Sequence, residues 1–149
     1  MRLVAGKKTD LGPIGVNVTH SVRQFREARR LGYAELSRKL AEMGRDIPPL
    51  GLRRIESGER RVDVDDLVAL ALALDVSLLA LLLPIDTSRL VPFGRQWDAE
   101  TMWMWATGSN PLPGNENFLR FLRDSNPLTD WSKVEGDIAK EVRRLGHDQ

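Results

Sequence analysis

The sequence contains no cysteine and only two histidines, His20 and His147, among its 149 residues. Without cysteine there is no disulfide framework, no cysteine-based zinc site and no thiol nucleophile. Two histidines leave little for metal or acid–base chemistry, so we expect no metal, no cofactor and no catalytic residue. No run of about 18 apolar residues occurs, and residues 1–20 lack the apolar core of a signal peptide, which favours a soluble, cytoplasmic protein.

Positive charge is concentrated in one part of the chain. The whole chain has a formal net charge of +1, but residues 20–62 carry a net +5 and residues 84–149 a net −2. A local excess of cations is usually a solvated surface, although it is also the electrostatic pattern of a nucleic-acid-binding region.

The beginning of the chain shows no sustained helical or strand period. It combines glycines and a proline with cations at Arg2, Lys7 and Lys8, and we interpret residues 1–17 as a flexible N-terminal arm. A basic arm could follow a groove of a nucleic acid, but a solvated terminus is the commoner case.

Residues 18–84 follow the pattern of five short helices. Apolar residues recur at helical spacing from about Thr19, and glycine or proline separates successive helices. The expected helices cover about 19–31, 33–43, 50–57, 67–74 and 78–83, with Gly44 and Gly58 as endings and with Asp63 and Ser77 as caps. Their apolar residues are sufficient for one small core.

The order and spacing of these segments resemble the lambda-repressor-like, or Xre, helix-turn-helix family. The resemblance rests on residues 22–26, 31–36, 55–61, 67–71 and 74–77 and covers roughly residues 18–83. It implies a five-helix DNA-binding domain whose second and third helices form the helix-turn-helix and whose third helix enters the major groove.

The sequence departs from the family pattern at Arg30, Tyr33 and Ser37, where the family usually has glycine, glutamine and alanine. The connection between Leu40 and Ile47 is also about five residues longer than the tight turn of the family. Residues 42–46 therefore either extend the second helix or loop out before the third. The Gly-Arg-x-Ile-Pro pattern of this connection resembles actinobacterial and actinophage regulators.

The resemblance also assigns DNA contacts. On the exposed side of the third helix it implies base contacts from Pro49, Leu50, Arg53 and Arg54. Arg54 is best suited to a base because the planar donors of arginine match guanine O6 and N7. Pro49 and Leu50 would contact thymine methyl groups. Contacts to the DNA backbone are expected from a second set of residues: Tyr33, Arg38, Lys39, Ser57, Arg60 and Arg61.

Two groups of charged residues have structural interpretations. Arg26 and Glu56 occupy positions that form an ion pair in the family, so we expect this pair to tie the third helix to the first. Asp63, Asp65 and Asp66 resemble a metal cluster only superficially, because they precede a helix whose amino end favours carboxylates.

Residues 85–149, which hold all four tryptophans, are predicted to form a helical C-terminal subdomain. Helices are expected over about 98–107, around Phe118–Leu122 and from about Thr129 onward. The last of them places its apolar residues on one face, at Trp131, Val134, Ile138, Val142 and Leu145.

This apolar face has three alternative partners. It could close a subdomain with Trp103 and Phe121, pair with its own copy, or pack on the fourth and fifth helices. We favour a subdomain that also supports a homodimer. A second DNA-contacting element built from arginines of this region is disfavoured by its negative net charge: Arg120, Arg123, Arg143 and Arg144.

The sequence therefore predicts an all-α protein that binds double-stranded DNA in a sequence-specific way, most simply a repressor that occupies operator DNA. The nearest alternative is an antitoxin or adaptor whose C-terminal region binds another protein. An enzyme is the weakest option. Self-cleaving repressors pair serine with lysine in a β-rich domain, whereas residues 85–149 are predicted to be helical and contain only Lys133 and Lys140.

Overall fold

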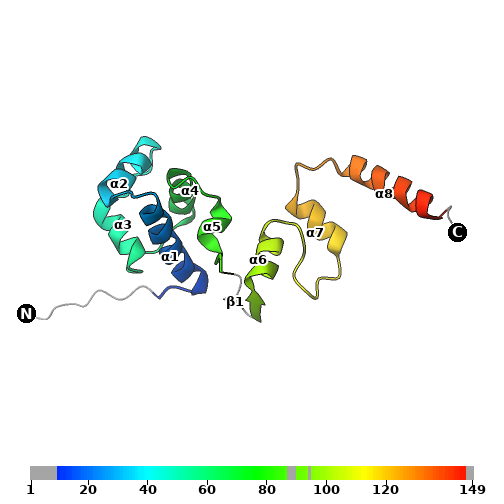
Figure 1. Ribbon diagram of the computed structural model, residues 1–149, viewed down its shortest axis with the longest axis horizontal. Coiled ribbons are helices and arrows are strands. Elements are labelled where there is room, and N and C mark those ends of the chain that lie inside the picture. The colour runs from blue at the N-terminus through cyan, green and yellow to red at the C-terminus, as the bar shows by residue number, and fades with distance from the viewer. Residues whose placement is uncertain (1–9, 87–89, 94, 147–149) are drawn as a thin grey trace, which may run out of the picture. The chain divides into compact units, whose positions relative to one another are not determined.

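The computed structural model describes residues 10–86, 90–93 and 95–146. The predicted arm residues Arg2, Lys7 and Lys8 lie outside this range. Figure 1 shows the first five helices gathered around one another. In chain order they are α1 (Pro13–Ala28), α2 (Tyr33–Glu42), α3 (Pro49–Glu56), α4 (Val64–Ala73) and α5 (Leu78–Leu82).

Helix α1 begins at Pro13, about six residues before the expected start near Thr19. Residues 13–17, which we predicted to be part of a flexible arm, are therefore helical. Pro13 is compatible with a helix because the first-turn amide has no helical partner in any case. Asn17 is buried on this added turn, and its Nδ2 donates to the Leu81 carbonyl at 3.3 Å. The extra turn thus joins α1 to α5.

Helices α1–α5 enclose a single apolar core. Each helix contributes the residues that its apolar spacing places on one face. The largest fully buried apolar side chains, two of which lie in the connections, are Leu36, Leu40, Ile47, Leu52, Ile55, Leu70, Leu74 and Leu81. Helix α4 is apolar on its outer side as well, since Val64, Val68 and Leu72 remain exposed.

The long connection between α2 and α3 loops out and does not extend α2. Gly44 ends α2 with a φ of +78°, a left-handed conformation that glycine adopts without steric cost. The chain then returns to the core, because Ile47 is fully buried and its carbonyl accepts a 2.7 Å hydrogen bond from Ser37 Oγ. Ser37, one of the departures from the family pattern, thus ties the connection to α2.

Helices α4 and α5 begin at the predicted caps. Asp63 Oδ1 accepts a hydrogen bond of 2.7 Å from the Asp66 amide, and Ser77 Oγ accepts one of 3.2 Å from the Ala80 amide. Each side chain satisfies an amide that has no partner within the helix.

The chain after Pro84 first forms a short hairpin that the sequence analysis did not predict. Strands β1 (Leu90–Phe93) and β2 (Arg95–Asp98) pair antiparallel, with Leu90 opposite Asp98. Helix α6 (Ala99–Ala106) follows, and its buried residues are Ala99 and Met102. The predicted all-α class is confirmed with this one small addition. The described residues up to Trp103 form one compact unit and those from Met104 another, whereas we had placed the division after residue 84.

The second unit contains α7 (Phe118–Ser125) and α8 (Trp131–Gly146), and neither helix has a buried residue. The Trp131 indole donates to the Asn126 carbonyl at 3.1 Å. The apolar face predicted for this helix, called the α8 seam from here on, consists of Trp131, Val134, Ile138, Val142 and Leu145. Of these, Ile138, Val142 and Leu145 are 51–64% exposed. Trp103, an expected partner of the seam, lies in the first unit and donates to the Pro84 carbonyl at 2.8 Å.

Candidate nucleic-acid interface

Helix α3 has one buried face and one exposed face. Leu52, Ile55 and Glu56 are buried, whereas Arg53 and Arg54 point to solvent. The first turn, which contains Pro49 and Leu50, is also exposed. The four residues for which we predicted base contacts therefore all lie on the accessible side of α3.

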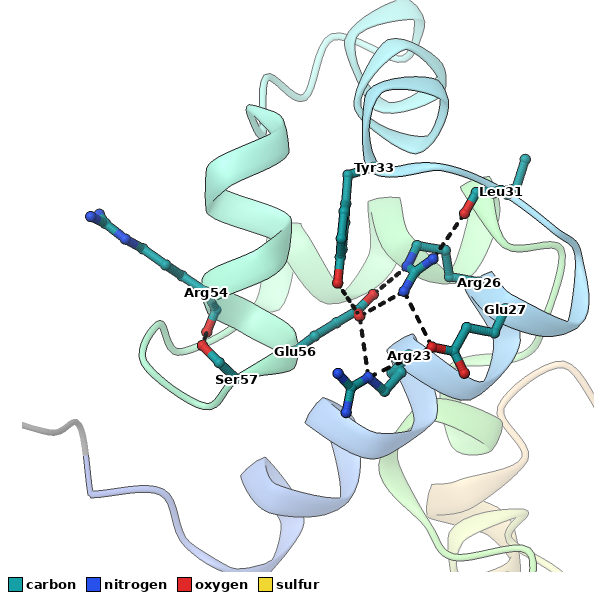
Figure 2. Close-up of polar contacts among 8 residues, drawn as sticks. All are labelled: Arg23, Arg26, Glu27, Leu31, Tyr33, Arg54, Glu56 and Ser57. Carbon is teal, nitrogen blue, oxygen red and sulfur yellow. Dashed lines mark hydrogen bonds and ion pairs between the residues drawn. The ribbon is translucent and has the colours of Figure 1, made fainter.

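The buried face of α3 is tied to α1 by Arg26 and Glu56, the residues expected to form an ion pair. Arg26 Nε and Nη2 donate to the two Glu56 carboxylate oxygens at 2.6 and 3.0 Å, as Figure 2 shows. Arg26 Nη1 also donates to the Leu31 carbonyl at 2.9 Å. The Glu56 side chain is only 1% exposed. A two-point pair of this kind fixes orientation as well as distance.

Tyr33 and Arg23 complete this cluster (Figure 2). The Tyr33 hydroxyl donates to Glu56 Oε2 at 2.8 Å, and Arg23 Nε lies 3.7 Å from the same oxygen. Desolvation and the hydrogen bond to Glu56 raise the pKa of Tyr33, and the hydrogen bond to Glu56 raises the pKa of Arg26. Arg23 was missed by the sequence analysis, although it lies one helical turn before Arg26 on α1.

Arg54 is exposed on α3. Within the described part of the chain, no hydrogen bond or ion pair of its guanidinium is present, and Figure 2 shows the side chain extending away from the Glu56 cluster. Its carbonyl accepts a 3.2 Å hydrogen bond from Ser57 Oγ. Arg53 differs, because its guanidinium lies 5.4 Å from the centre of the Tyr33 ring.

The residues predicted to contact the DNA backbone fall into two groups. Arg38 and Ser57 are exposed, and the only ion pair described for Arg38 is a surface contact of 3.6 Å with Glu42. The others have partners within the protein. Tyr33 binds Glu56, Lys39 Nζ is 3.5 Å from the Ala73 carbonyl, Arg61 donates to the Asp10 carbonyl, and Arg60 binds Asp66.

Asp66 is the buried centre of a second ion cluster. Its side chain is 1% exposed and accepts hydrogen bonds from Arg45 Nε at 2.7 Å and from Arg60 Nη2 at 2.8 Å. Arg45 also binds the Asp63 carboxylate at 2.7 Å. The bond to Asp66 raises the pKa of Arg45, and the Asp66 amide lowers that of Asp63. Arg45 was missed because it lies in the connection whose path the sequence left open.

The other charged groups considered above have ordinary surroundings. In the described ranges, no group of three histidine, cysteine or acidic residues could hold a metal ion. Of the four C-terminal arginines, three form exposed ion pairs: Arg120 with Asp124, Arg123 with Glu135 and Arg144 with Glu141. None of the helices described is long and apolar enough to cross a membrane.

Residues 22–81 match the family model HTH_3, described as Helix-turn-helix. The match runs from α1 into α5 and includes both buried ion clusters. It indicates a helix-turn-helix domain of the DNA-binding regulator type in this part of the chain. No curated protein and no solved structure matches the chain.

Proposed function

We propose that the protein is a sequence-specific transcriptional regulator that inserts α3 into the major groove, and that it acts as a repressor by occupying operator DNA. One observation supports this most directly. The exposed cations Arg53 and Arg54 lie on a helix whose opposite face is held by the Arg26–Glu56 pair. A helix that is held on one face and exposes arginines on the other is what base recognition requires.

Each residue of the interface then has a role. Arg54 reads guanine, Arg53 shares that role or binds phosphate, and Pro49 and Leu50 contact thymine methyl groups. Phosphates are bound by residues of α2 and the end of α3, of which Arg38, Ser57 and Arg61 are exposed and Tyr33 and Lys39 are half-buried. The Tyr33 hydroxyl has one proton, which it donates to Glu56, so it binds a phosphate only by exchanging that hydrogen bond.

Selection of bound sequences from a random DNA pool tests the proposal. We expect a defined motif, and Arg54→Ala should weaken binding to it by about 1–3 kcal/mol while relaxing one or two base positions. Arg38→Ala is the matched control because it removes the same charge from an exposed site on α2. Arg38→Ala should weaken binding to all DNA sequences alike. An unchanged motif after Arg54→Ala would contradict the base-reading role.

We further propose a homodimer formed through the α8 seam. The exposed Ile138, Val142 and Leu145 support it, since an apolar stripe of this kind favours a partner. Ile138→Asp should convert a dimer into a monomer in sedimentation and weaken operator binding at least tenfold, because linked half-sites gain from effective concentration. Gly136→Asp adds the same charge on the opposite side of α8 and should leave the dimer intact. A wild-type monomer at micromolar concentration would contradict this proposal.

The same exposed seam supports a second candidate function, an antitoxin or adaptor that binds another protein through its C-terminal region. Purification without DNA separates the two candidates. A heterologous partner present in equal amount favours the adaptor, whereas a pure homodimer favours the repressor. In either case we propose a cytoplasmic protein. The Gly-Arg-x-Ile-Pro pattern of the α2–α3 connection suggests an actinobacterial or actinophage regulator.

A further inference from the structure

The two connections that flank α3 meet at one carboxylate. Arg45, from the α2–α3 connection, binds one Asp66 oxygen, and Arg60, from the α3–α4 connection, binds the other. Asp66 itself belongs to the first turn of α4 and is 1% exposed. The segments before and after the proposed recognition helix are therefore held by a single buried group.

Arg60 also packs directly on α3. A Cβ atom added at Gly51 would lie 2.8 Å from Arg60 Nη1 and 3.2 Å from Ile47 Cγ2. Any side chain larger than glycine would thus push against the guanidinium that Asp66 holds. The absence of a side chain at Gly51 lets Arg60 lie against the first turns of α3 while it keeps its bond to Asp66.

We propose that Arg45, Arg60 and Asp66 form a positioning cluster that sets α3 at the angle required for base recognition. Arg60 then acts by holding α3 and not as a phosphate ligand, the role that its basic character alone had suggested. The cluster also explains how the long α2–α3 connection is tolerated, because Arg45 ties that connection to the start of α4. The inference rests on the proposed DNA-binding function.

Asp66→Asn distinguishes positioning of α3 from a purely electrostatic effect by the direction in which the affinity for DNA changes. The substitution removes a negative charge, so simple electrostatics predicts equal or tighter DNA binding. Loss of positioning predicts the opposite: roughly tenfold weaker binding to the selected operator, the size of one lost base contact, with non-specific binding nearly unchanged. Asp65→Asn is the matched control, because Asp65 is the adjacent acid on α4 and its side chain is 84% exposed. It should leave the ratio of specific to non-specific affinity unaltered.

Arg60→Ala provides a second test that keeps the Arg45–Asp66 bond. If Arg60 positions α3, operator affinity falls while the slope of log affinity against log salt stays at the wild-type value. A slope lower by about one unit would show a phosphate contact and overturn the proposal. In the Arg60→Ala/Asp66→Asn double variant the loss of affinity should not exceed that of the worse single variant. Fully additive losses would show independent roles.

Amide hydrogen exchange keeps the test independent of DNA. In Asp66→Asn we expect faster exchange in α3 than in wild type, with exchange in α1 unchanged. If wild-type protein binds no DNA sequence, the proposed function fails, and the exchange experiment still decides whether Asp66 holds α3. Equal exchange of α3 in wild type and variant would overturn the positioning cluster in either case.

Discussion

Helices α1–α5 and helices α7–α8 each have an apolar face in their sequence, but the two groups differ in how far that face is buried. Both groups place apolar residues at helical spacing, but Leu36, Leu52 and Leu70 are fully buried whereas Ile138 and Val142 are mostly exposed. The difference shows that amphipathic spacing predicts that a helix exists and which face is apolar. It does not predict whether the partner of that face lies in the same chain.

Charged residues differ between the two regions in the same way. In the first, Glu56 and Asp66 are 1% exposed and each is held by arginine. In the second, the ion pairs such as Arg120–Asp124 are exposed on both sides. Exposed pairs contribute little to stability, while breaking a buried pair leaves an uncompensated charge. Substituting one acidic residue in each region therefore tests whether the buried ion pairs contribute more to stability than the exposed ones.

The largest effect is expected for Glu56→Ala. Removal of the carboxylate leaves the buried Arg26 guanidinium without its two-point partner and leaves the Tyr33 hydroxyl without an acceptor. We expect a loss of about 3–5 kcal/mol in the free energy of unfolding, a large part of the stability of a small domain. Chemical denaturation followed by circular dichroism measures it.

Glu135→Ala serves as the control in the second region. Glu135 pairs with Arg123, but both side chains are more than half exposed. Its loss should cost less than about 1 kcal/mol. Similar losses for Glu56→Ala and Glu135→Ala would remove the energetic contrast between the two regions.

The sequence predicted the helices of the first region better than the chain that follows. Glycine and proline mark the ends of α2 and α3, and Asp63 and Ser77 mark the starts of α4 and α5, because these residues act locally. The hairpin β1–β2 was missed because its strands are short and contain Pro92, which weakens a strand pattern.

Apart from the Arg26–Glu56 pair, which the family resemblance implied, the candidate site could be predicted only where one helix determines it. The exposed side of α3 follows from its own periodicity, so Arg53 and Arg54 were found. Arg45 and Arg23 could not be assigned, because their partners Asp66 and Glu56 come from other helices. Arg60 was predicted to bind a DNA phosphate because its partner Asp66 also lies on another element. Its bond to Asp66 depends on how the α3–α4 connection folds back.

The next largest effect concerns the boundary between the two regions. Met102 is buried, and the Trp103 indole binds the Pro84 carbonyl, so α6 contributes to the first unit. A chain of residues 1–84 should therefore be about 2–4 kcal/mol less stable than one of residues 1–106, mainly through the lost burial of Met102 and its neighbours. Circular dichroism is the suitable probe, because residues 1–84 contain no tryptophan. Equal stability of the two chains would place the boundary at residue 84, as the sequence suggested.

The smallest effect is expected at two left-handed backbone positions, one in each region. Arg30 has a φ of +55° where the family usually has glycine, and Gly108 has a φ of +72°. Arg30→Gly should raise the free energy of unfolding by up to about 1 kcal/mol, since glycine adopts this conformation without the clash of a Cβ atom but loses more chain entropy on folding. Gly108→Ala should have the opposite sign, because its Cβ would lie 2.8 Å from Ser125 Cβ in addition to the strained φ. Thermal unfolding of both variants measures the difference. A destabilised Arg30→Gly protein would mean that the arginine side chain contributes more to the first region than the backbone strain costs it.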